Sequence, residues 1–596
     1  MFTPIPSRFT VALAIALAVL PASVAAQQPT VKETVVVTAT VAPESLLNVG
    51  RTVVLVTGEE LRQLPIVSVA DVLRLVASVD VRSRGPLGVQ SDLSIRGAAF
   101  SQALVLLNGI RLNDAQSGHH NSDIPVPLEE IERVEVLLGT GSSLHGADAT
   151  GGTVNIITRP NGRRLMANVA AGQYGLIDAS ATLGTTRGPV GHVVSGSFSR
   201  SDGFMPARDH VVRLGRYQAT IGRATTATLG IVDKEFGANG FYGPAPSREW
   251  TDQLFTTVQH RHARDSRWYA SADASYRTHG DRFIYDGRNP ALADNSHRTH
   301  AVEANLRWYS AVSPKTQLSL AASGGRDAIQ SNNLGRHDFT RGSLAAEVRQ
   351  SLGPRVVLHP GVRVDRYSRF GTSWSPSIAI SGSASDRLKL RASAGHAFRV
   401  PTFTELFYTD PNHHGAGALS PETAWSADAG ADLFTGSWTA GATFFTRWED
   451  NVIDWVRPSA SVRWRTANIR NVSTQGLETS LQRRLDAGGQ FRLQYTRLTS
   501  DATALGLLSK YVLDYARHSL AASGSSEWKD VRLGSRAEWK RRMDGRSYWT
   551  VDIQTSRAIR RAEVYVQVMN LFNQNYEEIR GVDMPGRWLT AGVKLK

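Results

Sequence analysis

The stretch that decides the fold is FRLQYT at residues 491–496, in which apolar and polar residues alternate. Its Phe, Leu and Tyr lie on one side of an extended chain, and its Arg, Gln and Thr lie on the other. The same alternation returns in WTVDIQ at 549–554, VYVQV at 564–568 and LTAGVKL at 589–595. Because no helical periodicity separates these segments, the pattern predicts antiparallel strands with one apolar face.

This alternation of apolar and polar residues begins near residue 160 and continues to the C-terminus. Clusters of Gly, Asp, Asn, Ser and Pro separate the alternating segments. An array of soluble β-sandwich domains would need a linker about every hundred residues, and none is visible. The 437 residues from 160 to 596 allow about 20 residues for each strand and connection in a barrel of about 22 strands. We therefore expect a membrane β-barrel of about 22 antiparallel strands over residues 160–596.

The composition excludes several classes of protein. The net charge is +14, but the basic residues are scattered and no nucleic-acid-binding motif occurs, so we expect no nucleic-acid partner. The chain has no cysteine, which excludes disulfides, cysteine metal sites and thiol nucleophiles. No convincing catalytic constellation is present. We expect neither an enzyme nor a protein with a cofactor.

The N-terminus has the layout of a secretory signal peptide. Arg8 precedes a mostly apolar run at 9–20, and small residues follow at 22–26, which predicts cleavage after Ala26. The apolar run is shorter than the roughly 20 residues that span a bilayer, and no run of that length follows it. We therefore expect an exported protein without a transmembrane helix.

Residues 27–159 differ in pattern from the strands that follow. Residues 27–50 are β-branched and then polar, as in an extended tether. Residues 51–159 mix helical and strand patterns and predict a compact α+β domain, with Thr57 and Ser68 as helix N-caps. The apolar run at 103–107 ends in Asn108-Gly109, which predicts a strand and a hairpin turn.

Motifs over nearly the whole mature chain resemble those of the TonB-dependent receptors of Gram-negative outer membranes. In the N-terminal part they are ETVVVTAT at 33–40, LSIRG at 93–97, LNGIRLND at 107–114, IERVEVLLG at 131–139 and LHGADATGGTVNIIT at 144–158. In the barrel they are FRVPTFTELF at 398–407, LSPET at 419–423, NVSTQGLE at 471–478 and the C-terminal box from 568 to 596. The chain departs from the family by ending in VKLK rather than in an aromatic residue, which puts the efficiency of barrel assembly in question.

The resemblance implies that residues 51–159 form a plug inside the barrel and that residues 33–40 form a TonB box. Three consecutive valines favour an extended segment, which can add as a strand to a sheet edge of TonB, an inner-membrane energy-transducing protein. The TonB-binding residues implied are Glu33, Thr34, Val35, Val36, Val37, Thr38, Ala39 and Thr40. Polar contacts between plug and barrel are expected at Arg96, Glu132, Arg133 and Glu135.

The function implied by the resemblance is energised, plug-gated import of a scarce metal-containing solute, either cobalamin or a ferric siderophore. The importer would be a monomer in outer-membrane lipid. Chain size and the lack of an extra signalling domain look most like the cobalamin branch of the family. One alternative is a haem or free-metal receptor of the same architecture. Another is a non-energised adhesive or porin-like barrel; a porin would need neither residues 33–40 nor the domain at 51–159.

Candidate solute contacts lie in the connection after Asp114 and in a barrel loop after Asp410. Neutral imidazoles can ligate a metal or contact a metal complex or a corrinoid. The alternative is that these histidines form only local hydrogen bonds. The candidate residues are Ser117, His119, His120, Asn121, His413 and His414.

Overall fold

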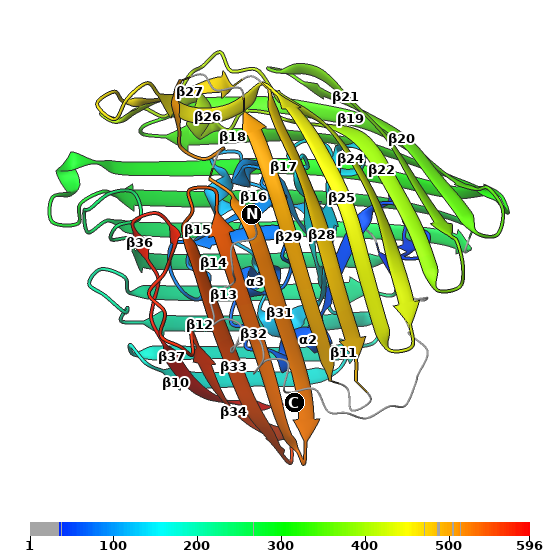
Figure 1. The fold of residues 1–596 in the computed structure, drawn as a ribbon, viewed down its shortest axis with the longest axis horizontal. Coiled ribbons are helices and arrows are strands. Elements are labelled where there is room, and N and C mark those ends of the chain that lie inside the picture. The colour runs from blue at the N-terminus through cyan, green and yellow to red at the C-terminus, as the bar shows by residue number, and fades with distance from the viewer. Residues whose placement is uncertain are drawn as a thin grey trace.

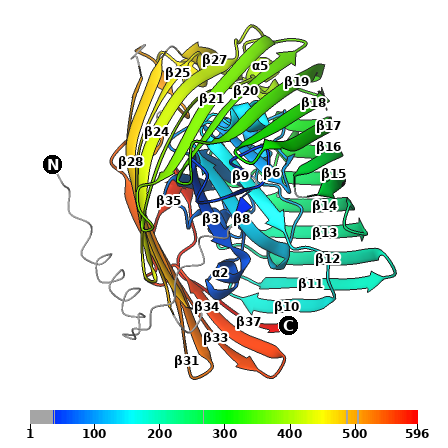
Figure 2. The ribbon, with the colours of Figure 1, turned by 90° about the vertical axis from the view of Figure 1, so that its right-hand side faces the viewer.

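The computed structural model describes residues 35–36, 38–265, 267–469, 471–485, 489–502, 506–512 and 514–595. The predicted signal peptide lies outside these ranges, as do Glu33, Thr34 and Val37 of the expected TonB box. Within the described chain, no helix is both long and apolar enough for a membrane span. The described residues form a closed barrel with a smaller α/β domain inside it (Figures 1 and 2).

The described chain closes its barrel with 22 antiparallel strands, which confirms the predicted fold class. The first eleven are β10 (Arg164–Gly172), β11 (Leu176–Arg187), β12 (Val190–Ser201), β13 (His210–Ile221), β14 (Thr225–Gly237), β15 (Arg248–Asp265), β16 (Trp268–Ile284), β17 (Asp294–Ser313), β18 (Thr316–Ser331), β19 (Gly335–Ser351) and β20 (Val356–Tyr367). The others are β21 (Gly371–Ser383), β22 (Leu388–Arg399), β24 (Glu422–Thr435), β25 (Trp438–Asp450), β28 (Val472–Arg484), β29 (Gln490–Ala502), β31 (Ala516–Trp528), β32 (Val531–Arg542), β33 (Ser547–Ile559), β34 (Ala562–Met569) and β37 (Trp588–Leu595). Because β37 pairs with both β34 and β10, the ring has no open edge.

The barrel strands turn apolar side chains outward and polar side chains inward, the reverse of a water-soluble β-protein. On β14, Leu229 and Ile231 are 42% and 52% exposed, whereas Thr228 and Lys234 are buried. Leu344 on β19 is likewise exposed. An apolar outer surface of this kind is suited to contact with lipid.

The plug is a mixed sheet with short helices and a separate hairpin. Its sheet has the strand order β3 (Thr52–Thr57), β8 (Ile131–Leu138), β9 (Gly152–Thr158), β6 (Ala103–Leu107) and β7 (Ile110–Arg111). The hairpin is β4 (Val79–Ser83) and β5 (Ser91–Ile95), and the helices are α2 (Gly58–Gln63), α3 (Val69–Leu73), α4 (Ser142–His145) and the 3-10 turns η2 (Phe100–Gln102), η3 (Gly118–His120) and η4 (Leu128–Glu130). Figure 2 shows β3, β8 and β9 enclosed by the barrel wall.

Local sequence signals in the plug are confirmed. The Thr57 and Ser68 hydroxyls accept hydrogen bonds from backbone N–H groups in the first turns of α2 and α3, so both residues are N-caps. Asn108 and Gly109 both have positive φ, at 51° and 81°, in the turn between β6 and β7. This is the backbone geometry that an Asn-Gly hairpin turn requires.

The connections at the two ends of the barrel differ in length. One end has short turns, as between β11 and β12, and the other has longer loops, as expected for the periplasmic and extracellular ends of such a barrel. Three long loops join in a small sheet of β23 (His413–His414), β27 (Trp464–Ile469), β26 (Val452–Arg457) and β30 (Leu508–Ser509). Smaller elements are β1 (Val35–Val36), β2 (Glu44–Ser45), η5 (Pro290–Leu292), α5 (Phe403–Phe407), β35 (Glu577–Ile579) and β36 (Val582–Asp583).

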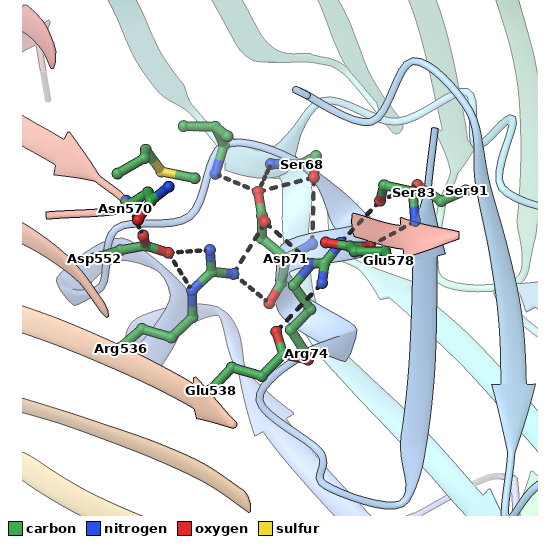
Figure 3. Close-up of polar contacts among 12 residues, drawn as sticks. Ser68, Asp71, Arg74, Ser83, Ser91, Arg536, Glu538, Asp552, Asn570 and Glu578 are labelled. Atoms are coloured by element: carbon green, nitrogen blue, oxygen red, sulfur yellow. Dashed lines mark hydrogen bonds and ion pairs between the residues drawn. The ribbon is translucent and has the colours of Figure 1, made fainter. Parts of the chain in front are cut away.

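A network of buried charges holds the plug to the wall and to the last loop (Figure 3). Arg74, which follows α3, donates to Glu578 of β35 at 2.7 Å and to Glu538 of β32 at 3.3 Å. Beside it, Arg536 of β32 donates to Asp71 of α3 at 3.0 Å. These side chains are nearly inaccessible to solvent. Since burying each charge costs several kcal/mol, the arrangement is stable only while the partners stay together.

We expect Arg74→Met to destabilise the folded receptor by about 3–5 kcal/mol, because it leaves the buried Glu578 without its cation and leaves Glu538 with Lys540 alone. Denaturant unfolding in detergent micelles, followed by tryptophan fluorescence, measures the change. The matched control is Arg213→Met, since Arg213 pairs with Asp233 on the exposed outer face of the barrel and should contribute little. Equal effects of the two substitutions would contradict the conclusion that the buried ion pairs of Arg74 stabilise the contact between plug and barrel.

Candidate functional site

The plug loop that carries four of the candidate residues is shaped by its own polar side chains. Ser117 is the N-cap of η3, and its hydroxyl accepts the His119 N–H at 3.4 Å. The Asn121 side chain accepts the Asp114 N–H at 3.0 Å. Ser117 and Asn121 are both buried. Their observed contacts therefore fix the position of the two histidines between them.

His119 lies in an aromatic cluster where the plug meets two long loops of the barrel. Its ring stacks on Phe100 of η2, with centroids 4.4 Å apart. Edge contacts with Tyr511 and Tyr242 come from the loops after β29 and β14. We call these four residues the aromatic vestibule. None of the three aromatic partners was among the candidates, because nothing in the local sequence indicates that the loops fold back onto the plug.

The protonation state of His119 follows from its partner Asp92, whose Oδ1 lies 2.6 Å from Nδ1. Burial opposes ionisation of Asp92, but the neighbouring Arg84 guanidinium holds its pKa well below the usual range. Burial lowers the pKa of His119, and Asp92 only partly offsets this effect. The ring is therefore neutral at pH 7. Nδ1 donates to the carboxylate, so Nε2 keeps its lone pair.

His120 points to the barrel wall rather than to the vestibule. Its Nε2 lies 3.4 Å from Asp281 of β16, and its ring centroid lies 4.5 Å from that of His279 on the same strand. Burial lowers the pKa of His120, but the hydrogen bond and charge of Asp281 outweigh it and raise the pKa to about 9. Two neighbouring residues thus face different surroundings.

The loop histidines lie on β23 in the small sheet formed by the three long loops. His413 has its Nδ1 3.0 Å from Asp410 and its Nε2 3.0 Å from Lys510, which donates. His414 is exposed on the same strand. Because Lys510 precedes Tyr511, one loop segment contacts both His413 and the aromatic vestibule. The structure therefore brings His119 and His413 to one region and leaves His414 at its margin.

The expected polar contacts between plug and barrel divide into two groups. Arg96 reaches the wall through a bidentate pair with Glu478 of β28, at 2.7 and 2.8 Å. Arg133 instead bonds to Glu132 and Glu135 within the plug. Of this set, Arg96 is the residue whose bond to the wall is established in the described part of the chain.

The described part of the expected TonB box is docked on the plug. Val35 and Val36 form β1, which pairs with β2. Thr38 donates its N–H and hydroxyl to Glu135 at 3.0 and 2.6 Å. His145 donates its Nε2–H to the Thr38 carbonyl at 2.8 Å, and burial lowers the pKa of His145 to about 4, so its ring is neutral. Thr38 and Thr40 are buried. We call the bonds at Thr38 the Thr38 latch.

A closed barrel with an apolar outer surface, filled by an N-terminal domain, defines a plugged receptor of the outer membrane. Residues 166–571 match the family model described as TonB dependent receptor-like, beta-barrel, and residues 45–153 match the TonB-dependent Receptor Plug Domain. The chain therefore belongs to the TonB-dependent receptor family, and it is a plug-gated receptor.

Proteins that are similar in sequence or in fold agree with this family. The chain is 25% identical to the vitamin B12 transporter BtuB of Photobacterium profundum, covering 98% of this chain and 99% of the relative. It is 26% identical to BtuB of Vibrio vulnificus, covering 78% of each chain. The siderophore receptor PirA of Pseudomonas aeruginosa shares the fold, with a TM-score of 0.71 and 19% identity over 91% of this chain and 98% of that chain.

We expect Glu135→Gln to loosen the Thr38 latch, because two hydrogen bonds to a carboxylate become weaker bonds to a neutral amide. A Thr40→Cys background reports the change, since the chain has no other cysteine and Thr40 is buried. Maleimide labelling at pH 7 should accelerate about tenfold, which corresponds to a loss of about 1.4 kcal/mol. Glu132→Gln, on the same strand but partly exposed, is the control and should leave the rate unchanged.

Proposed function

We propose that the chain imports a solute across the outer membrane, driven by TonB bound at residues 33–40, without making or breaking a covalent bond. The observation that carries this proposal is a plug that fills the barrel and holds the described part of the box through the Thr38 latch. A segment held by a few hydrogen bonds can open locally at a small part of the total stability. Export by the predicted signal peptide would place the latch end in the periplasm.

The solute proposed is a corrinoid, with cobalamin as the first candidate. The relatives that cover most of this chain are vitamin B12 transporters, and the solved siderophore receptors share only the fold. The aromatic vestibule offers ring faces and a neutral imidazole, which suit a large, partly apolar metal complex. A passive porin is disfavoured because the plug occupies the lumen.

Energised uptake depends on strand pairing at the box, so we expect Val36→Pro to abolish cobalamin uptake by cells while leaving surface binding intact. Proline removes the N–H that a paired strand donates. Val36→Thr is the matched control, since it keeps a β-branched side chain and the N–H. Uptake and binding are measured with radiolabelled cobalamin. Normal uptake by the Val36→Pro variant would refute TonB-driven import through this segment.

For the solute, we expect Tyr511→Ala to weaken binding of cobalamin to the purified receptor about tenfold. The substitution removes one wall of the aromatic vestibule, and a contact of this kind is worth about 1 kcal/mol or more. Tyr309→Ala is the control, because Tyr309 stacks on Tyr269 near the short-turn end of the barrel. Saturable binding of a ferric siderophore, with none of cobalamin, would overturn the corrinoid assignment.

A further inference from the structure

A cluster of metal-binding side chains lies below the aromatic vestibule, between the plug and the wall. His120 comes from η3 of the plug, Glu249 from β15 and Asp281 from β16. One donor atom from each lies within 4.8 Å of the others, and all three residues are buried. We infer that these residues form a binding site for a divalent transition-metal ion that joins the plug to the barrel.

In each carboxylate of this cluster, one oxygen accepts a hydrogen bond from the plug and the other has no hydrogen-bond partner in the described part of the chain. Gln116 donates to Asp281 Oδ2 at 2.7 Å, and Gln90 donates to Glu249 Oε1 at 3.3 Å. Asp281 Oδ1 and Glu249 Oε2 are buried and have no hydrogen-bond partner in the described part of the chain. A buried acceptor without a partner costs about 1–3 kcal/mol, and more when it is charged. A cation between the two free oxygens would remove this cost.

The charge balance of the neighbourhood points to the same two carboxylates. The adjacent aspartates each have a cation: Arg277 lies 2.5 Å from Asp114, and Lys234 lies 2.6 Å from Asp123. Over the described residues, neither Glu249 nor Asp281 forms an ion pair with Lys or Arg. Glu249 and Asp281 therefore have no basic neighbour in the described chain within ion-pair distance other than His120, which lies beside Asp281. Because buried charges need pairing, a divalent cation fits this deficit.

The donor types decide which ions suit the site. One imidazole and two carboxylates match the ligand preferences of Zn²⁺, Co²⁺ and Mn²⁺, whereas Ca²⁺ and Mg²⁺ prefer an all-oxygen set. Ligand atoms at about 2.1 Å from one ion lie at most about 4.2 Å apart. Since the donor atoms all lie within 4.8 Å of one another, their separations need to close by at most about 0.6 Å. His279 lies beside His120 and could supply a further nitrogen.

A bound ion would have a mechanical consequence beyond the import function proposed above. Its ligands come from both the plug and the barrel, so the ion would cross-link the plug loop that carries His120 to β15 and β16. An ion that binds only the assembled receptor stabilises it by an amount that rises with the logarithm of the ion concentration above Kd. The site needs neither TonB nor the imported solute, and both can be left out of its test.

The test uses the full-length receptor, purified in detergent and stripped with a chelator, and titrated with ZnCl₂ by calorimetry and with CoCl₂ by visible absorption. We expect one equivalent of Zn²⁺ to bind and to raise the unfolding temperature. Glu249→Gln combined with Asp281→Asn should lower the affinity at least tenfold and abolish the thermal shift. The matched control is Asp252→Asn, on β15 but about half exposed and paired with Arg298, which should bind as the wild type does.

A second readout separates metal binding from a purely structural role. Without metal, the double variant should unfold at the same temperature as the wild type or higher, because the amides keep the size of the carboxylates and remove two buried acceptor oxygens that have no hydrogen-bond partner in the described part of the chain. A lower unfolding temperature of the metal-free variant would show that the carboxylates serve only packing and hydrogen bonding, and would overturn the inference. So would absence of saturable Zn²⁺ and Co²⁺ binding by the wild type, or an equal loss in Asp252→Asn.

Discussion

Pairing of β37 with β10 satisfies the last open strand edges of a sheet whose outer surface faces lipid. Lipid offers no hydrogen bonds to a backbone, so every barrel strand must find its partners within the ring. Once the ring is closed, its outer side chains are apolar and its inner ones polar. This inversion gives the lumen a polar lining, to which a domain that carries charged side chains can bind.

The plug binds to this lining with paired charges rather than with apolar contacts alone. Arg74, Arg536 and Arg96 each join plug and wall through carboxylates that are almost inaccessible to water. Such pairs contribute little net stability, but they are costly to break singly. They therefore hold the plug in one position, whereas the Thr38 latch depends on a few hydrogen bonds and can open by itself.

The two histidines of the apical plug loop face different surroundings. His119 faces the aromatic vestibule, where a neutral ring and loop aromatics can receive a solute. His120 faces the wall, among carboxylates that lack a full set of cations. A ligand in the vestibule and an ion at the wall would thus act on the same short turn, η3, which offers a route from solute binding to the position of the plug.

The sequence by itself determined the barrel strands, an α+β domain before them and the N-caps Thr57 and Ser68, because alternation and capping depend on residues close along the chain. That this domain is a plug was implied by the resemblance of its motifs to a family. The sequence also indicated the loop that carries His119 and His120. Only the tertiary structure decided that these neighbours face opposite surroundings and that Tyr511 joins the vestibule. Such contacts depend on barrel register and loop closure between residues hundreds of positions apart, and no local pattern encodes that geometry.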